Sequence, residues 1–353
     1  MSENSHFLSV PIIFGEQVRR RLLDLNLLDI DRRIVSEEGR LFFPLQREIV
    51  LSEIFPDANH IDYSTGIMEF PPMLSGPRTM RDALQVQLTE KELDLLPRAY
   101  DLIGDIAVLE IPTELIEYRY TIGEAFLQVR PSFTTILGKR GAIGGTIRTR
   151  EYELLAGIDK TDTIHTEYGC KIAVDLSKAY FSPRLLEEHN RIAQLVQEGE
   201  QVVDMFTGVG PFALHIARKV RAKIVAVDIN PDAIQLLKTS ITMNRLVGTI
   251  ELITADIREY TSEAVSSFAD RVIMNHPSGA SDFVAEACQI LATDGIIHYY
   301  DFIGGDDPEE TLSAKLAILV EKAGRKVKDV VLIRRVRDSA PYEYHMVIDA
   351  IIE

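Results

Sequence analysis

The sequence has few cysteines, few cations relative to its anions and no long apolar run. Its 353 residues include two cysteines, Cys170 and Cys288, which form neither a metal-ligand spacing nor a disulfide framework. No apolar stretch approaches the roughly 20 residues that span a bilayer. The first ten residues, MSENSHFLSV, lack the basic and apolar regions of a signal peptide. We therefore expect a cytoplasmic protein without a membrane segment.

The shortage of cations argues against unspecific binding of nucleic acid through overall charge. Lys and Arg number 38 against 54 Asp and Glu, which gives a net charge of −16, whereas phosphate contacts dominate affinity for nucleic acids. One segment departs from this balance, because residues 118–150 contain six cations and one anion, together with several glycines whose backbone can approach phosphates. The segment is either an ordinary solvated face or a local footprint for a polyanion.

The length exceeds that of one typical domain. We expect a small α/β domain over 1–62, a linker rich in proline and glycine over 63–81, a basic α+β domain over 82–170, and an α/β domain over 171–353. From residue 201 onward apolar strands alternate with helical segments, which predicts a doubly wound, Rossmann-like parallel sheet. The apolar segments 330–336 and 343–352 are expected to close it as an antiparallel pair.

A glycine turn between two strands is the most informative motif. The stretch 202–212, VVDMFTGVGPF, is an apolar run that ends in Asp204 and leads through Gly208 and Gly210 into a helix. The next apolar run ends in Asp228, 20 residues after Gly208. Glycines allow a ligand close to the backbone, and a carboxylate after the second strand is placed to accept hydrogen bonds from a ribose. The motif predicts a cofactor that contains adenosine.

Two further strand ends separate S-adenosylmethionine (SAM) from a nicotinamide. The stretch 250–256, IELITAD, ends in an acid, and 269–277, ADRVIMNHP, ends in Asn-x-Pro. A dehydrogenase remains an alternative, because Gly208, Gly210 and Asp228 also fit the relaxed dinucleotide fingerprint. Acids and Asn-x-Pro at successive strand ends are typical of SAM methyltransferases. The candidate cofactor-binding residues are Tyr180, Asp204, Phe206, Gly208, Gly210, Asp228, Ile229, Asp256, Ile257, Asn275 and Pro277.

Six blocks carry a resemblance to a known family. They are 98–112, 148–157 (RTREYELLAG), 180–185 (YFSPRL), 204–212, 269–277 and 339–344 (SAPYEY). With these blocks the chain resembles the archaeal and eukaryotic tRNA (guanine-N1-)-methyltransferases, which modify the guanosine at position 37, immediately 3′ of the anticodon. The resemblance implies an archaeal-type, monomeric enzyme whose cofactor is SAM and whose partner is tRNA. The middle domain would hold the anticodon stem-loop, and the N-terminal domain would contact the outer tRNA body.

The resemblance also implies three catalytic residues. Guanine N1 carries a proton at neutral pH, so methylation requires a general base and a group that stabilises the charge left on O6. Glu188, eight residues beyond Tyr180, matches the family's catalytic glutamate, and Arg148 matches its arginine. Asn275 would hold the base edge or the methionyl part of SAM. Whether Arg148 or Arg150 serves the chemistry stays open at this point.

The chain departs from the family at His276, where Asn-x-Pro commonly contains an apolar residue. This departure leaves open whether a wyosine-pathway intermediate at the same tRNA position is also a substrate. The nearest alternative is a related enzyme that transfers the aminocarboxypropyl group of SAM to a tricyclic base there. A non-catalytic RNA-binding protein is a further alternative. We find no metal-ligand spacing in the sequence and expect no metal.

Overall fold

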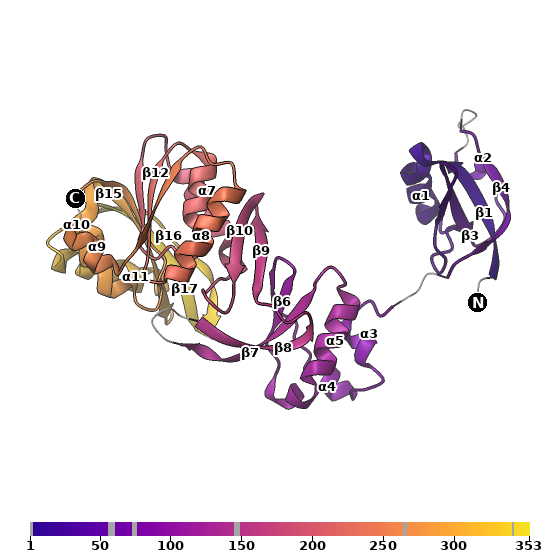
Figure 1. The fold of residues 1–353 in the computed structure, drawn as a ribbon, viewed down its shortest axis with the longest axis horizontal. Coiled ribbons are helices and arrows are strands. Elements are labelled where there is room, and N and C mark those ends of the chain that lie inside the picture. The colour runs from indigo at the N-terminus through magenta and orange to yellow at the C-terminus, as the bar shows by residue number, and fades with distance from the viewer. Residues whose placement is uncertain (1–2, 56–60, 73–75, 145–148, 264–266, 341) are drawn as a thin grey trace. The chain divides into compact units, whose positions relative to one another are not determined.

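The computed structural model describes residues 3–55, 61–72, 76–144, 149–263, 267–340 and 342–353 (Figure 1). By its internal contacts the chain divides into two units, residues 1–83 and 84–353. Among the described residues, no helix combines the length and the apolar character needed to cross a bilayer.

The first unit is a four-stranded antiparallel sheet in the order β2-β3-β1-β4, with one longer helix packed on it. Its core joins Leu8 and Phe43 of the sheet to Val18 and Leu22 of the helix. The expected small α/β fold therefore forms. The elements are β1 (Glu3–Pro11), α1 (Gly15–Asp24), β2 (Val35–Glu37), β3 (Arg40–Leu45), the short α2 (Leu51–Ile54) and β4 (Ser64–Phe70).

Strand β4 corrects the expectation of a linker over 63–81. It pairs antiparallel with β1 along its whole length, and Phe70 at its end is fully buried. Gly66, which suggested a linker, lies opposite Phe7, where a Cβ atom would stand 2.9 Å from the aromatic ring. The glycine thus makes room for a cross-strand neighbour, a role that local sequence does not distinguish from a flexible turn.

The second unit begins with the short helices α3 (Met80–Leu84, across the boundary) and α4 (Glu90–Asp94) and a small sheet in the order β5-β6-β7-β8. Helix α5 packs closely on this sheet at Gly123, where a Cβ atom would stand only 2.6 Å from the side chain of Leu155. The absence of a side chain at Gly123 allows this close approach. The expected α+β middle region is therefore present. Its main elements are β5 (Tyr100–Ile103), β6 (Ile106–Leu109), a 3-10 turn (Thr113–Tyr118), α5 (Arg119–Val129), β7 (Thr135–Gly144) and β8 (Thr149–Gly157).

A two-stranded hairpin of β9 (Asp162–Glu167) and β10 (Cys170–Asp175) follows. The expected boundary between 170 and 171 would cut this hairpin. The hairpin is fastened to the last region, because the backbone N–H of Ala173 donates to Ser240 Oγ at 2.9 Å and that of Lys171 donates to Asn244 Oδ1 at 2.9 Å. The change from middle to last region therefore falls before β9.

The last region contains a seven-stranded sheet in the order β13-β12-β11-β14-β15-β17-β16. Its first five strands are parallel, and β17 joins β15 and β16 antiparallel, as the sequence predicts. The doubly wound fold is therefore confirmed. The strands are β11 (Gln201–Asp204), β12 (Lys223–Asp228), β13 (Thr249–Thr254), β14 (Ala269–Met274), β15 (Leu291–Gly304), β16 (Val327–Ala340) and β17 (Glu343–Ile352).

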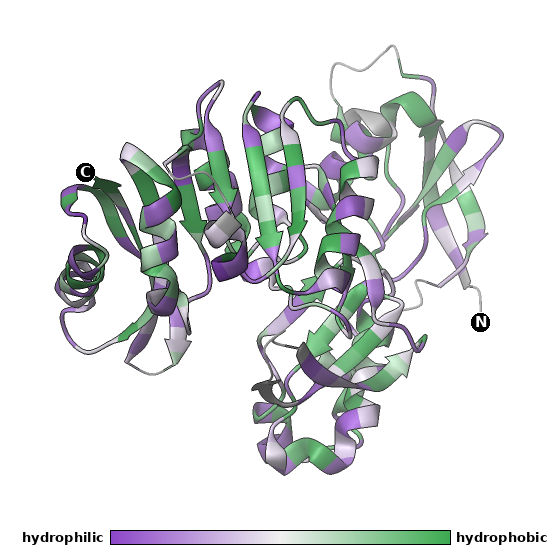
Figure 2. Cartoon of the chain, turned by 60° about the vertical axis from the view of Figure 1, so that its left-hand side comes forward, coloured by the Kyte–Doolittle hydropathy of each residue, from purple (hydrophilic) through white to green (hydrophobic). Residues whose placement is uncertain are grey.

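Helices cover both faces of this sheet and form two separate cores. One face carries α6, α7, α8 and the β9–β10 hairpin, and the other carries α9, α10 and α11 (Figure 1). Figure 2 shows the strands of the sheet mostly in the hydrophobic colour, as expected for parallel strands that are buried on both faces. The helices are α6 (Leu186–Leu195), α7 (Pro211–Lys219), α8 (Pro231–Met243), α9 (Ile257–Glu263), α10 (Val284–Ile290) and α11 (Pro308–Lys322).

Candidate active site

The glycine turn lies between β11 and α7 and has the backbone that its sequence requires. Gly208 and Gly210 have φ angles of 54° and 80°, in the left-handed region that favours glycine. At Gly210 a Cβ would also lie 2.2 Å from Leu237 on α8. Gly210 therefore serves helix packing and does not line the cavity described below.

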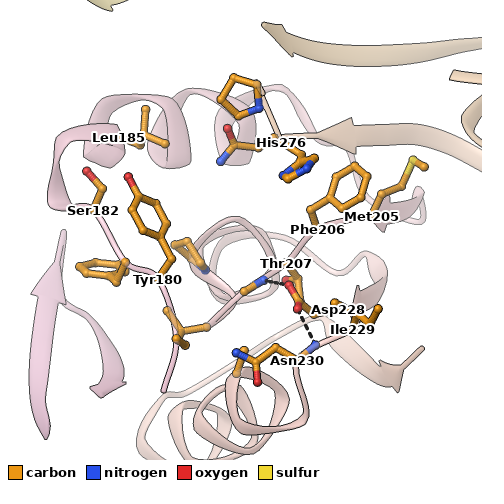
Figure 3. A pocket seen from close by; sticks show the side chains of 18 of the residues that line it. Tyr180, Ser182, Leu185, Met205, Phe206, Thr207, Asp228, Ile229, Asn230 and His276 are labelled. Carbon is orange, nitrogen blue, oxygen red and sulfur yellow. Dashed lines mark hydrogen bonds between the residues drawn. The ribbon is translucent and has the colours of Figure 1, made fainter. Parts of the chain in front are cut away.

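Asp228 fastens this turn to the end of β12. Its Oδ2 accepts a hydrogen bond of 2.7 Å from the backbone N–H of Gly208, and its Oδ1 accepts one of 2.9 Å from that of Asn230 (dashed in Figure 3). Burial raises the pKa of this carboxyl, and the two backbone donors partly offset that effect. Each carboxylate oxygen can accept a further bond, so Asp228 can hold the turn and bind a ligand hydroxyl together.

The carboxyl ends of β11 to β14 surround one cavity. Nine of the eleven predicted cofactor residues line it, together with further residues from β15 to β17. Figure 3 shows Tyr180 on one side of the cavity and Phe206, Asp228 and His276 on the other. The nine predicted residues are Tyr180, Phe206, Gly208, Asp228, Ile229, Asp256, Ile257, Asn275 and Pro277.

Asn275 has a buried amide oxygen at the cavity that a bound ligand could satisfy. It follows β14 directly and lines the cavity. Its Oδ1 is buried and has no hydrogen bond partner among the described residues. Buried polar atoms in native proteins are normally hydrogen-bonded, so a donor from a bound molecule would satisfy this oxygen.

Asp204 lies behind the cavity and does not line it. Its side chain is fully buried, and neither carboxylate oxygen has a hydrogen bond partner within the described structure. Burial raises the pKa of Asp204 to about 7, and the nearby Asp228 adds to the shift. Because Asp204 does not line the cavity, its expected direct contact with a cationic ligand stays a prediction.

Glu188 is a buried charge in a network and is not among the residues that line the cavity. Arg191 Nη2 lies 2.9 Å from its Oε2, and the hydroxyl of Tyr300 donates to the same oxygen at 2.8 Å. Arg334 on β16 forms an ion pair with Oε1. The neighbouring His189 does reach the cavity wall, so Glu188 lies just behind that wall.

Arg148 lies outside the described residues, whereas Arg150 is placed. Arg150 lines a second groove, which adjoins the cavity through Tyr180 and Arg337. Its Nε is buried without a hydrogen bond partner in the described part of the chain. The groove also contains Lys139 and Arg184, each paired with Asp101 at 3.1 and 2.6 Å.

Several cations of the basic segment 118–150 form ion pairs with acids that the fold brings beside them. Arg119 and Arg140 both pair with Glu153, at 3.2 and 3.1 Å, and Lys139 pairs with Asp101. These acids lie outside the segment in sequence and are brought beside it by the β5-β6-β7-β8 sheet. The segment therefore offers fewer free charges to a polyanion than its composition suggests.

Sequence reasoning missed part of the cavity wall. Phe283 and His276 both lie beside Phe206, with their ring centroids 5.1 and 5.0 Å from that of Phe206. His276 is the residue at which the chain differs from the family pattern. Phe302 and His345 come from β15 and β17, with their rings 5.2 Å apart. Aromatic residues in strands read as core, and only the strand order places these side chains at the cavity, so no local signal identifies them.

The fold and the cavity define the class. A sheet of this order, a glycine turn after β11, an acid after β12 and Asn-x-Pro after β14 are the features of a Rossmann-like methyltransferase domain. The family model for the TRM5/TYW2 methyltransferase domain matches residues 163–333. The TYW2 N-terminal domain matches 80–161, and the tRNA methyltransferase 5 N-terminal domain matches 8–53.

Relatives match almost the whole chain. The tRNA (guanine(37)-N(1))-methyltransferase Trm5b of Pyrococcus abyssi is 36% identical over 340 residues, 96% of this chain and 97% of the relative. Trm5b of Methanocaldococcus jannaschii is 38% identical over 95% of each chain. The crystal structure of Trm5b from Pyrococcus abyssi superposes with a TM-score of 0.70, at 35% identity and 99% coverage of both chains. The chain belongs to the TRM5/TYW2 methyltransferase family, on its Trm5 side.

Two further similar structures are complexes, one with a tRNA and one with a small molecule. The complex of aTrm5 and tRNALeu matches with a TM-score of 0.72, at 34% identity, over 98% of this chain and 99% of that one. Pyrococcus horikoshii TYW2 in complex with MeSAdo matches with a TM-score of 0.66, at 29% identity, over 77% of this chain and 97% of that one.

Proposed function

We propose that this protein transfers the methyl group of SAM to N1 of the guanosine at position 37 of tRNA. One observation carries the proposal: the cavity assembles nine predicted cofactor residues in a chain that matches Trm5b enzymes over nearly its full length. The match of residues 8–53 to the tRNA methyltransferase 5 N-terminal domain supports the same branch of the family.

The cavity fits SAM by its donor and acceptor set. Asp228 would accept from the ribose hydroxyls, and Asp256 with Ile257 would border the adenine. The buried Oδ1 of Asn275 would accept from an ammonium group of the methionyl part or from the base edge. When bound, SAM supplies an electrophilic methyl group on its sulfonium.

We assign general base catalysis to Glu188 and stabilisation of O6 to Arg148. The N1 proton would pass to the Glu188 carboxylate as the N1–methyl bond forms, and the guanidinium would stabilise the negative charge that develops on O6. Glu188 must first turn towards the cavity. The Arg334 side chain is 41% exposed, so we propose that bound tRNA attracts it and releases Glu188, while Arg191 and Tyr300 remain in place.

The groove beside the cavity is the proposed route for the anticodon loop. It contains Arg150, Arg184 and Arg337 and shares Tyr180 with the cavity. A flipped guanine would thus pass from the groove to the methyl donor, at a cost of a few kcal/mol for unstacking. We assign the outer tRNA body to the N-terminal unit. One chain carries both cavity and groove, so we propose a monomeric enzyme. We also propose that it acts in the cytoplasm, on the tRNA there.

The aminocarboxypropyl alternative has support of its own. The tRNA(Phe) (4-demethylwyosine(37)-C(7)) aminocarboxypropyltransferase of Pyrococcus horikoshii is 31% identical over 76% of this chain and 95% of its own length. The match of residues 8–53 to the tRNA methyltransferase 5 N-terminal domain, together with Trm5b relatives that cover 95% or more of this chain, favours the methyl-transferring branch.

Two labels on SAM separate these functions. SAM labelled in its methyl group and SAM labelled in its aminocarboxypropyl chain would each be incubated with a transcript that has guanosine at position 37, and with tRNA that carries 4-demethylwyosine. We expect label from the methyl group in the guanosine transcript, and no label from the aminocarboxypropyl group in either RNA. Aminocarboxypropyl label in the demethylwyosine tRNA, without methyl label in the guanosine transcript, would establish the alternative.

A further inference from the structure

A buried cluster of one carboxylate and two imidazoles lies behind the cofactor cavity. Glu167 comes from β9, His189 from α6 and His215 from α7, three elements that meet on one face of the large sheet (Figure 1). The three residues are 1%, 1% and 6% exposed. One ligand atom of each lies within 4.8 Å of the other two.

The cluster is only partly satisfied by hydrogen bonds. His189 Nδ1 lies 2.7 Å from Glu167 Oε2, in hydrogen-bonding geometry. His215 Nε2 lies 3.2 Å from the same oxygen but makes no hydrogen bond, and Glu167 Oε1 is likewise buried without a partner among the described residues. Two buried polar atoms of one cluster that make no hydrogen bond are costly unless something else binds them.

A third histidine lies beside the carboxylate. The Nδ1 of His165 accepts a hydrogen bond of 3.1 Å from the backbone N–H of Gly104, and its Nε2 lies 3.6 Å from Glu167 Oε1, too far for a hydrogen bond. His165 is not in the group whose ligand atoms lie close together, so the candidate ligands are Glu167, His189 and His215.

The chemistry of the three side chains suits a cation. Imidazole and carboxylate groups are ligands that divalent transition metals bind, and a cation would neutralise a carboxylate that is buried at this place.

We propose that Glu167, His189 and His215 bind a divalent transition metal ion, Zn²⁺ in the first place. Two histidines and one carboxylate are a common zinc ligand set. Tetrahedral ligands about 2.0–2.1 Å from zinc are about 3.4 Å apart. Glu167 Oε2 lies 2.7 Å from His189 Nδ1 and 3.2 Å from His215 Nε2, and all three ligand atoms lie within 4.8 Å of one another, so small side-chain shifts would bring them to these distances. Three protein ligands leave the fourth tetrahedral position to a water molecule, and we assign the ion a structural role because its ligands are buried.

The metal would join the two helices that carry the active site. Helix α6 presents Glu188 next to His189, and α7 begins directly after the glycine turn. Glu167 would link both helices to the β9–β10 hairpin. The ion would thus fix the position of the proposed base relative to the cofactor cavity without contacting a substrate.

Metal content and zinc titration test the proposal without any activity measurement. The untagged full chain would be stripped with a chelator, titrated with Zn²⁺ against a chromophoric competitor and melted with and without zinc. We expect one equivalent of tightly bound Zn²⁺, and a melting temperature that rises by several degrees at saturation. Absence of stoichiometric binding in the stripped wild-type chain would overturn the proposal, whatever the variants do.

Two variants locate the site. His215→Gln, alone or with Glu167→Gln, should weaken zinc binding by at least about 100-fold. His6→Gln, in β1 of the first unit, is the matched control and should retain one equivalent. Equal zinc binding by wild type and the double variant would place the ion elsewhere and overturn the assignment. Because neither readout depends on methyl transfer, a failure here leaves the proposed function intact.

Discussion

The hydroxyl of Tyr300 on β15 donates a hydrogen bond of 2.8 Å to Oε2 of Glu188 on α6. A donor to a carboxylate favours its ionised form, which a general base needs. Tyr300→Phe should therefore lower kcat about 10- to 100-fold at neutral pH, the equivalent of one hydrogen bond to a charged group. The acidic limb of the pH profile of kcat should move to higher pH. A variant with reduced kcat but an unshifted pH profile would make Tyr300 merely structural.

Glu188→Gln removes the proposed proton acceptor. It should lower kcat roughly 10²–10⁴-fold while the Kd for SAM stays within about a factor of three of wild type, because Glu188 does not line the cofactor cavity. Single-turnover transfer and equilibrium dialysis measure the two quantities. Normal turnover by Glu188→Gln would remove the residue from the chemistry.

Arg148 and Arg150, the two candidates for the catalytic arginine, should differ in the kinetic constant that they affect. Arg148→Ala should lower kcat roughly 10²–10⁴-fold with little change in KM for tRNA. Arg150 lines the groove, so Arg150→Ala should mainly raise KM for tRNA. Steady-state kinetics on one transcript decides between them, and the reverse pattern would exchange their roles.

Asp228 is expected to hold the ribose. Asp228→Asn should weaken SAM binding about 10- to 100-fold, since a hydrogen bond to a charged group contributes about 1.5–3 kcal/mol. Asp232→Asn, at an exposed position in the first turn of α8, is the matched control. Calorimetric titration measures both affinities. An unchanged affinity in Asp228→Asn would separate this carboxylate from the cofactor.

The raised pKa of Asp204 predicts that this residue lowers the free energy of unfolding as pH rises. Its pKa is about 7 when folded and 3.8 ordinarily, so the folded chain retains a proton that the unfolded chain releases. Stability therefore falls as pH rises from about 4 to about 7, by an amount on the order of 4 kcal/mol. Asp204→Asn, neutral throughout, should gain on wild type by a few kcal/mol between about pH 4 and about pH 8. Urea unfolding measures the free energy of unfolding of both proteins at these two pH values. The same difference between Asp204→Asn and wild type at about pH 4 and about pH 8 would contradict this prediction.

Local patterns predicted the strand ends well. The acids and Asn275 at the ends of β12, β13 and β14 follow apolar runs in sequence, and parallel pairing brings them to one edge of the sheet. Nine of the cofactor residues therefore lie together as expected. Their side-chain roles as ligands and catalysts stay predictions.

Features set by distant parts of the chain were not predictable. Gly210 packs against Leu237 on α8, and Gly66 lies opposite Phe7. Each glycine is therefore required by a neighbour that is remote in sequence. The burial of Glu188 depends on Tyr300 and Arg334, which the antiparallel strands at the end of the sheet bring to α6. Residue types alone contain no information about such register.

The most direct test of the central claim is methyl transfer from labelled SAM to two tRNA transcripts that differ only at position 37. We expect label in the transcript with guanosine there, recovered as N1-methylguanosine after digestion, and none in the transcript with adenosine. Equal label in both transcripts would place the methylated nucleotide elsewhere and contradict methylation of guanosine 37. No label in either transcript would contradict the methyl transfer itself.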